Sequence, residues 1–580
     1  MYLPKRPVKP AENPFAVQKS RRFIIASGIM AFVTTTIASY FAIEKVRRRQ
    51  RRPDGVLDQH RNGKRVVIVG AGAAGCALAA SITSACPDVH VTVIERDKKH
   101  VFYAAVPLAH VGHRSYDLNT TGGVDLLRSP ATWNVTREAV LVRGEALRID
   151  TNNREVVVRE DPEATTTGVS PDAIELQPQK SRIWISRLLS GRLRGSDPTS
   201  MERRYRYDVL VLACGAERSL GSLGTFLSAD QIDRYRIAVN PGITRDCLVH
   251  LYEGTVLHVK VPPASFTEVS AGSQPCAAMR YASRQHDGTF IGTVNTVWRY
   301  LFFFNKLRLC PYIAVTADSQ PSDALPADVN DRVKAFWDRR GVDFNPCTHV
   351  VHLDSHRSEA TLYNRVTREK RVVKYRLLLL DLPLVAPSFI RNSGLSRSAH
   401  AEGFAEVDPH TLQHVDHPNI FAIGDCAALP TVKSYGAAFA QVPVVSHNVR
   451  QQLLHGASGE DEDSRKANTS TRSCFAQYDG YSSFHIVMTT WRAMWPEVKY
   501  SDRRETAVCH TLDRAPLLLT NNHIWDNLAW ADIRGFMNAV YYQFFAYEVM
   551  FYFLFTRAVW YPPRWFSVPT FDANGLPMQA

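Results

Sequence analysis

A glycine-rich turn between a β-branched run and an alanine-rich run is the feature that most constrains the fold of this chain. Residues 66–69 read Val-Val-Ile-Val, and the glycines that follow have the spacing Gly-x-Gly-x-x-Gly. The first run predicts a strand, and the second, from about residue 74 to 83, predicts a helix. In such a unit the first glycine makes the turn, the second lets the backbone approach a pyrophosphate, and the third lets the helix lie close to the strand. We therefore expect a dinucleotide at the helix N-terminus, in contact with Gly70, Gly72, Ala73, Ala74 and Gly75.

An acidic residue follows at the distance that dinucleotide sites use for the ribose. A second predicted strand, residues 89–95, ends in Glu95, which comes 20 residues after Gly75. A carboxylate at this distance typically hydrogen-bonds a ribose hydroxyl. A glycine-rich turn also occurs in other α/β domains, but the combination of strand, helix and Glu95 favours a dinucleotide site.

Composition excludes several other classes of protein. The 580 residues are enough for two or three domains, and 45% hydrophobic residues are enough to build their cores. The net charge of +13 comes without a nucleic-acid-binding module, so we expect anionic lipid and not nucleic acid as the charged partner. The ten cysteines include no Cys-x-x-Cys pair and no regular spacing, which argues against a zinc site or a disulfide scaffold. We predict no metal site.

Two segments precede the glycine-rich turn. Residues 1–22 are polar and basic and predict a flexible tail. Residues 23–43 carry no charge, and as a helix they are long enough to cross a membrane, for which about 20 residues suffice. A buried helix and an uncleaved targeting segment are the alternatives. Basic residues flank this segment on both sides, so its orientation is not predicted.

Two apolar strands further along the chain end in residues suited to a cofactor. Residues 207–215 predict a buried parallel strand whose small end residues, Ala213 and Gly215, would let a cofactor pass over them. Residues 417–425 predict a strand that ends in Gly424 and Asp425, where the carboxylate could bind a polyol hydroxyl. A predicted helix, residues 436–454, follows, and its N-terminus could point at a flavin ring. The stretch 161–204 lacks periodicity and predicts a surface insertion with room for one short helix.

These pieces occur in the order that is typical of flavoproteins with two dinucleotide-binding domains. The chain thus resembles the disulfide-reductase-like superfamily, which implies FAD as the cofactor. We expect an α/β fold with two Rossmann-like domains of the FAD/NAD(P)-binding type, an N-terminal transmembrane helix and a C-terminal membrane-interface region. The expected boundaries are a tail (1–22), a transmembrane helix (23–43), the first part of the FAD domain (62–245) with its insertion (161–204), a second Rossmann-like domain (246–400), the second part of the FAD domain (401–484) and a C-terminal membrane-associated region (485–580).

The lack of a second glycine fingerprint and the position of one cysteine indicate which kind of flavoprotein this is. Between Gly215 and Gly424 there is no second glycine fingerprint, so a nicotinamide dinucleotide lacks its usual cradle and another electron donor is implied. Cys426 directly follows Asp425, which would let its sulfur reach the flavin ring. The alternative is that Cys426 is a small buried core residue.

Several downstream segments resemble the eukaryotic mitochondrial sulfide:quinone oxidoreductases. They are Glu253-Gly254, residues 403–414, residues 424–433 and residues 478–483. The resemblance implies that Cys426 is one of two redox cysteines, that Asp425 contacts the flavin, and that Lys433 lies near the ring or the quinone. It also implies a location at the mitochondrial inner membrane.

The second redox cysteine is where the chain departs from this family. Relatives have a Cys-Ala-Gly-x-Pro segment, and this chain has Ser270-Ala-Gly-Ser-Gln-Pro-Cys276. We assign the role to Cys276. If the alignment instead puts Ser270 at the site, the usual chemistry fails, because serine cannot form a persulfide.

The mechanism implied by the family starts with attack of sulfide on a Cys276–Cys426 disulfide. One sulfur becomes a persulfide, its sulfane sulfur passes to an acceptor, and two electrons reach FAD and then a quinone. Because quinones dissolve in lipid, the enzyme must touch a bilayer. The aromatic residues of 525–565, interrupted by Gln543 and Glu548, predict an interfacial helix more than a transmembrane span.

Two other functions remain open. Ser270 and the insertion at 161–204 would fit an FAD-binding accessory subunit of a membrane complex without sulfide turnover. A type II NADH:quinone oxidoreductase would need a nucleotide site that the sequence does not contain.

Overall fold

The computed structural model describes most of residues 63–498. The predicted tail, the candidate transmembrane segment 23–43, Ser270, Cys276 and the aromatic segment 525–565, apart from Val540, lie outside the described residues. The longer stretches outside the description are 1–62, 102–106, 108–122, 126–138, 161–172, 176–201, 265–286, 397–401, 456–474 and 499–580 except 540.

The first of two larger sheets has eight strands in the order β19-β9-β1-β2-β5-β6-β8-β7. Neighbours from β19 to β5 pair in parallel, and neighbours from β5 to β7 pair antiparallel. The strands are β1 (Arg65–Val69), β2 (His90–Glu95), β5 (Val140–Asp150), β6 (Glu155–Glu160), β7 (Ala173–Glu175), β8 (Glu202–Arg206), β9 (Val209–Leu212) and β19 (Ile420–Ala422). The glycine-rich turn therefore follows an inner strand of this sheet, as the sequence predicts.

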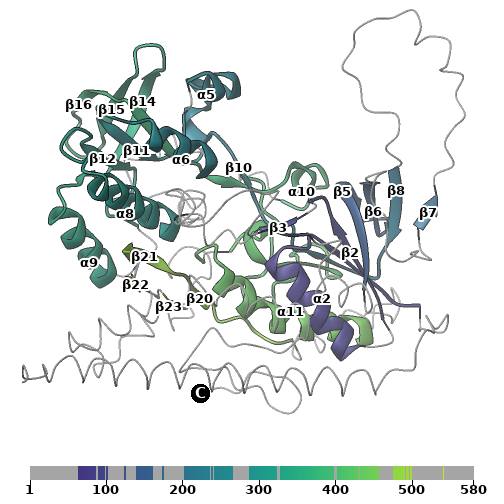
Figure 1. Cartoon of the computed structure of the whole chain (residues 1–580). Coiled ribbons are helices and arrows are strands. Elements are labelled where there is room, and N and C mark those ends of the chain that lie inside the picture. Colours follow the sequence, from purple (N-terminus) through teal and green to yellow (C-terminus); the bar gives the residue numbers. More distant parts are fainter. Residues whose placement is uncertain are drawn as a thin grey trace, which may run out of the picture. The chain divides into compact units, whose positions relative to one another are not determined.

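Two helices lie side by side against the parallel part of this sheet (Figure 1). They are α2 (Ala73–Ala85) and α11 (Tyr435–His455). A side-chain hydrogen bond joins them, in which the Ser81 hydroxyl donates to Ser446 Oγ at 2.8 Å. The helix predicted after the glycine-rich turn and the helix predicted from residue 436 are thus both confirmed. One core unites side chains from these helices and from strands β1, β2, β9 and β19.

The stretch predicted to be an insertion contributes strands to the edge of the sheet. Its described residues include β7, which pairs with β8, and β8 in turn pairs with β6. Tyr205 explains the position of β8, because its side chain is 2% exposed and joins the core. No helix occurs among the described residues between 161 and 204.

The second larger sheet is parallel throughout, in the order β13-β12-β11-β17. Phe290 and Trp337 are fully buried in the core of this region, which also carries an antiparallel meander. The elements are β11 (Val256–Lys260), β12 (Tyr312–Thr316), β13 (Asp343–Asn345), β17 (Leu377–Asp381), the meander β14 (Thr348–Asp354), β15 (Glu359–Asn364) and β16 (Lys370–Lys374), and the helices α6 (Pro241–Val249), α8 (Asp287–Phe303) and α9 (Ala327–Asp338).

Shorter elements complete the described chain. They are β3 (Lys99–Val101), β4 (Gly123–Asp125), β10 (Glu217–Arg218), η3 (Gly221–Thr225), α5 (Ala229–Tyr235), β18 (Leu384–Val385), α10 (Ser388–Asn392), η5 (Gly424–Cys426), β20 (Ser482–Ser483), β21 (Ile486–Thr489), β22 (Arg492–Met494) and β23 (Glu497–Val498). Within the ranges that the structure describes, no helix is both long enough and apolar enough to span a membrane.

An ion pair occupies the carboxyl edge of the second sheet. Lys260, the last residue of β11, places its Nζ 2.5 Å from Asp318 Oδ2, and the two side chains are 9% and 8% exposed. Asp381 ends the neighbouring strand opposite Lys260. Burial raises the pKa of Asp381 to about 6, although the charges of Arg218 and Lys260 oppose the shift. A nicotinamide-binding domain has a glycine-rich turn at the end of its first strand. At the corresponding edge of this sheet, Lys260 of the ion pair is followed by Val261 and two prolines.

We expect the Lys260–Asp318 pair to hold this edge together. Replacing Asp318 by leucine should lower the free energy of unfolding by about 3–5 kcal/mol, because the Lys260 ammonium would stay buried without its carboxylate. The double change Lys260→Met and Asp318→Leu should recover most of that loss. Urea unfolding followed by circular dichroism measures both effects.

The exposed pair Arg371–Asp343 is the matched control, with Nη1 and Oδ2 3.4 Å apart and side chains 58% and 48% exposed. Asp343→Leu should change stability by no more than about 1 kcal/mol. Equal losses at Asp318 and Asp343 would contradict a special role for the buried pair.

Candidate functional site

Four parallel strands of the first sheet bring most of the predicted cofactor-binding residues to one edge. Strands β2, β1, β9 and β19 are neighbours and run in the same direction, so their carboxyl ends meet. The residues brought together there are Gly70, Gly72, Ala73, Ala74, Gly75, Glu95, Ala213, Gly215, Gly424 and Asp425. Ligands of open α/β sheets bind at such an edge.

Gly70 and Gly75 are glycines because the backbone is packed around them. Gly70 has a φ of +105°, and a Cβ there would overlap the carbonyl oxygen of Ala213. A Cβ on Gly75 would collide with the carbonyl oxygen of Gly70. The turn is held by the Gly70 N–H, which donates to the Ile94 carbonyl at 2.7 Å. The missing side chain of Gly75 therefore lets helix α2 approach the end of β1 closely, and the missing side chain of Gly70 makes room for the backbone that follows β9.

Gly72 is a glycine for a different reason. It precedes α2 as its N-cap, has no side-chain cap, and has no protein atom within 4 Å of the place where a Cβ would be. Ala73 and Ala74 then begin the helix. The free N–H groups and partial positive charge of a helix N-terminus suit a phosphate. This open position beside the glycine turn fits a dinucleotide pyrophosphate.

Glu95 lies beside the glycine-rich turn. Its Oε2 accepts the Ala71 N–H at 2.6 Å, and its Oε1 accepts the Asp97 N–H at 2.8 Å. Burial raises the pKa of Glu95, while these backbone hydrogen bonds oppose the rise. The carboxylate is thus fixed at the end of β2, where a ribose hydroxyl would be bound.

The end of β19 meets the start of α2 through another glycine. Gly424 has a φ of +72°, and a Cβ there would lie 3.6 Å from the Ala74 Cβ. Its N–H donates to Gln441 Oε1 at 2.7 Å, which ties the strand end to α11. Sequence reasoning missed Gln441, because a glutamine inside a helix carries no signal of its buried partner.

Lys433 is buried near Asp425 and Cys426. Its Nζ donates to the Ala427 carbonyl and lies 4.8 Å from the centre of the Phe404 ring. Burial lowers the pKa of Lys433 to about 8, and the charges of Asp425 and Cys426 oppose the shift. The ammonium is therefore tied back to the protein and acts on Cys426 through its charge.

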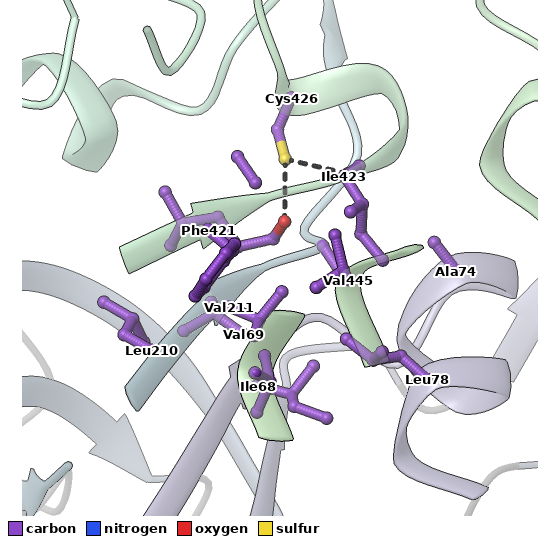
Figure 2. Close-up of a cluster of buried hydrophobic side chains, with 14 of the residues drawn as sticks. Ile68, Val69, Ala74, Leu78, Leu210, Val211, Phe421, Ile423, Cys426 and Val445 are labelled. Atoms are coloured by element: carbon purple, nitrogen blue, oxygen red, sulfur yellow. Dashed lines mark hydrogen bonds between the residues drawn. The ribbon is translucent and has the colours of Figure 1, made fainter. Parts of the chain in front are cut away.

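Cys426 is fully buried (Figure 2). Its sulfur lies 3.4 Å from the Leu212 carbonyl oxygen and 3.3 Å from that of Ile423, and it points into a cluster of apolar side chains. The preceding Asp425 is half-buried. This burial agrees with the alternative that the sequence left open, in which Cys426 is a small core residue, and the redox role of Cys426 stays a prediction.

A second thiol contacts Cys426. Cys214 follows β9, is half-buried, and shares a side-chain hydrogen bond with Cys426. That bond lowers the pKa of Cys426, as does the Lys433 charge, although burial acts against them. The same bond, together with burial, raises the pKa of Cys214. Sequence reasoning passed over Cys214, although it stands between the predicted contacts Ala213 and Gly215.

Known proteins match parts of this chain. Residues 64–225 match the pyridine nucleotide-disulphide oxidoreductase family model. The mitochondrial sulfide:quinone oxidoreductase of Dictyostelium discoideum is 30% identical over 166 residues, which are 28% of this chain and 31% of that protein. That of Mus musculus is 30% identical over 133 residues, or 23% of this chain and 25% of that protein.

This chain resembles the mitochondrial sulfide:quinone oxidoreductases. The predicted resemblance is thus confirmed, and the family match also supports the predicted cofactor, FAD. The similar segment spans about a third or less of the length of these relatives.

Two solved structures share the fold. The sulfide:quinone oxidoreductase of Aquifex aeolicus superposes with a TM-score of 0.53 at 14% identity, over 75% of this chain and 84% of that chain. A chain of the Tetrahymena thermophila mitochondrial ATP synthase superposes with a TM-score of 0.53 at 17% identity, over 88% of this chain and 100% of that chain. Both likenesses concern the α/β fold.

The two glycines of the turn should respond differently to the same substitution. Gly75→Ser should destabilise the fold by about 1–3 kcal/mol, since the new side chain overlaps backbone. Gly72→Ser should preserve stability, because serine is a good N-cap, yet its side chain would fill the space next to the phosphate position. Thermal unfolding and the ratio of flavin to protein absorbance measure the two effects.

Full flavin retention by Gly72→Ser would argue against a pyrophosphate at this helix N-terminus. An unchanged melting temperature for Gly75→Ser would argue against the close backbone approach.

Burial of Lys433 should make stability depend on pH. Its pKa is about 8 in the folded chain and ordinarily 10.5, so between these values the unfolded chain holds a proton that the folded chain has lost. Stability should therefore rise with pH in this window, by up to about 1.4 kcal/mol per pH unit, and Lys433→Met should remove this contribution. The test is urea unfolding of the wild type and of Lys433→Met from pH 7.5 to 10. If the difference between their free energies of unfolding stays constant over this range, Lys433 keeps its ordinary pKa.

Proposed function

We propose that this protein is an FAD-dependent oxidoreductase of the sulfide:quinone oxidoreductase type, which oxidises sulfide and passes two electrons to a membrane quinone. The observation that carries the proposal is the dinucleotide cradle at Gly70, Gly72 and Gly75, in a segment that matches the pyridine nucleotide-disulphide oxidoreductase family. The similarity to relatives named as mitochondrial sulfide:quinone oxidoreductases supports the choice of substrates and a mitochondrial location. A quinone acceptor that dissolves in lipid would place the protein at the inner membrane.

Residues of both parts of the first domain would hold the cofactor. The helix N-terminus at Gly72 would bind the pyrophosphate, Glu95 the ribose, and Asp425 a hydroxyl of the flavin side chain. Bound FAD would supply the two-electron acceptor. Ala213 and Gly215 would leave room for it, since neither has a bulky side chain.

The sulfur chemistry needs a partner for Cys426. Sulfide attack on a disulfide breaks the S–S bond and leaves one sulfur as a persulfide and the other as a thiolate. Transfer of the outer sulfur to an acceptor would leave two reduced cysteines. The two cysteines would form the disulfide again by giving up two electrons, for which bound FAD would supply the acceptor. Cys276 is the partner that the sequence suggests, and Cys214 is the cysteine that contacts Cys426 among the described residues.

Electrostatics would favour Cys426 as the leaving group. A thiol with a low pKa leaves a disulfide more readily. The Cys214 hydrogen bond lowers the pKa of Cys426 when Cys276 is the disulfide partner and Cys214 keeps its proton, and the Lys433 charge lowers it with either partner. In a Cys214–Cys426 disulfide, sulfide would attack Cys214, which is half-buried, and not the fully buried Cys426. Both cysteines should therefore be tested along with Cys276.

A second candidate function is that of an FAD-holding accessory subunit of a mitochondrial membrane complex, without sulfide turnover. Complete burial of Cys426 favours it, because a core thiol is poorly placed to react with a substrate. The fold likeness to a chain of a mitochondrial ATP synthase, which extends over the whole of that chain, also favours it.

Sulfide titration of the full-length protein separates the candidates. The oxidoreductase should lose its flavin absorbance when sulfide is added without oxygen and regain it when a soluble quinone follows. Bound FAD that sulfide never bleaches would establish the accessory role and overturn the enzymatic one. Bleaching by NADH alone would instead favour an NADH:quinone oxidoreductase.

Cysteine variants locate the chemistry. Cys426→Ser should reduce sulfide-dependent quinone reduction to the rate without protein, and serine in place of the reacting partner, Cys214 or Cys276, should do the same. Cys310→Ser is the matched control, because Cys310 is equally buried but lies in the core of the second sheet. Full turnover by Cys426→Ser would remove its redox role.

A further inference from the structure

Exposed apolar side chains gather at one end of helix α8. Nine large hydrophobic side chains are strongly exposed in the described part of the chain, and six of them belong to this region. We call these six the aromatic patch: Val249 (48% exposed), Tyr252 (71%), Phe302 (62%), Phe303 (76%), Phe304 (54%) and Leu309 (61%). Such a concentration marks an interaction surface, whereas single exposed hydrophobics are ordinary.

The core does not require the phenylalanines to be apolar. Helix α8 already buries Val294, Val297 and Leu301 completely on its inward face. Phe302 and Phe303 end the helix on the outside, and Phe304 follows. Folding alone therefore does not explain three consecutive aromatic residues that water can reach.

The patch is one surface, although its residues come from separate segments. The Lys306 ammonium donates to the carbonyls of Leu248 and Val249 at 3.1 and 3.3 Å. It also lies 5.3 Å from the centre of the Tyr252 ring. The Gly254 N–H donates to the Leu309 carbonyl at 2.8 Å. The end of α6 is thus tied to the turn that follows α8.

Arginines adjoin the patch. The Trp298 ring stacks on Phe302 with centroids 5.1 Å apart, and the Arg340 guanidinium lies 4.3 Å from the centre of Trp298. The pKa of Arg340 is lowered to about 10 by burial and by the charges of Arg299 and Arg339. These arginines are therefore close enough to repel one another.

Positive charge outweighs negative charge around these side chains. Arg245 and Arg308 are exposed on the segments that carry the patch, and Lys306 lies within it. Within residues 245–253, 298–309 and 338–340 the acidic residues are Asp246, Glu253 and Asp338. The basic residues in the same ranges are Arg245, Arg299, Lys306, Arg308, Arg339 and Arg340.

We propose that the aromatic patch docks this protein onto a bilayer of anionic lipid, with the phenylalanines among the acyl chains and the cations at the headgroups. Exposed aromatics with adjacent lysines and arginines have the chemistry of a membrane interface, since long cationic side chains reach the headgroups while apolar groups enter the lipid. The excess of cations complements the negative surface of such a bilayer. This inference goes beyond the proposed function, because docking would occur whether or not sulfide is turned over.

Hydrogen–deuterium exchange of the full-length protein tests the patch itself. Vesicles of phosphatidylcholine and phosphatidylglycerol should slow exchange in peptides that cover residues 300–309, and vesicles of phosphatidylcholine alone should slow it much less. Vesicle binding that leaves exchange at 300–309 unchanged would show that other segments bind the membrane, and would overturn the proposal.

Flotation of variants gives the energetic test. Phe302→Ser with Phe303→Ser should weaken binding to the anionic vesicles by about tenfold or more, since two aromatic side chains no longer enter the lipid. Val366→Ser with Val372→Ser is the matched control, because these side chains are 74% and 61% exposed elsewhere. Light scattering of the wild type and the phenylalanine variant completes the test. If the patch mediates self-association and does not bind vesicles, it is a protein interface and the proposal fails.

Discussion

The close approach of helix α2 to strand β1 is the contact on which the rest of the structure depends. It exists because Gly75 has no side chain, and a Cβ there would overlap the carbonyl of Gly70. The missing side chain of Gly70 in turn makes room for the carbonyl of Ala213, which follows β9. The approach sets the N-terminus of α2 at the carboxyl edge of the parallel strands, and it lets Ala74 meet Gly424 at the end of β19. Strands β1 and β19, which are distant in sequence, thereby end at one edge of the sheet, where a dinucleotide fits.

Burial then decides the chemistry of each sheet edge. The first edge keeps an open position beside Gly72, with Glu95 fixed close by. The second edge is occupied by the Lys260–Asp318 ion pair. Around Cys426 the low dielectric of the core strengthens the effects of the Cys214 hydrogen bond and the Lys433 charge. These effects lower the pKa of the Cys426 thiol, while its sulfur is enclosed by the core. That combination makes sulfide turnover and an accessory role both worth testing.

Much of the first sheet and of the helices packed on it could be predicted from sequence, because the signals for these elements are local. The strand before the glycines, the helix after them and the helix from residue 436 all follow from runs of a few residue types, and the structure contains each of them. Predictions that depend on distant contacts fared differently. The sequence left the burial of Cys426 as only one of two alternatives. It did not predict the strands within 161–204, because these strands form by pairing with β6 and with each other and have no local sequence pattern. The aromatic patch also went unnoticed, since a Phe run looks the same whether it is buried or exposed.

The sequence by itself determined the strand–turn–helix unit, the carboxylate of Glu95 at the end of the next strand and the resemblance to sulfide:quinone oxidoreductases. These depend on the spacing of residues that are close along the chain, and such spacing dictates local backbone conformation. Only the tertiary structure decided that Cys214 meets Cys426, that Gln441 holds Gly424, and that α8 leaves its phenylalanines exposed. These contacts depend on which strands become neighbours and on which face of a helix the core covers, and both are settled by packing across the whole domain.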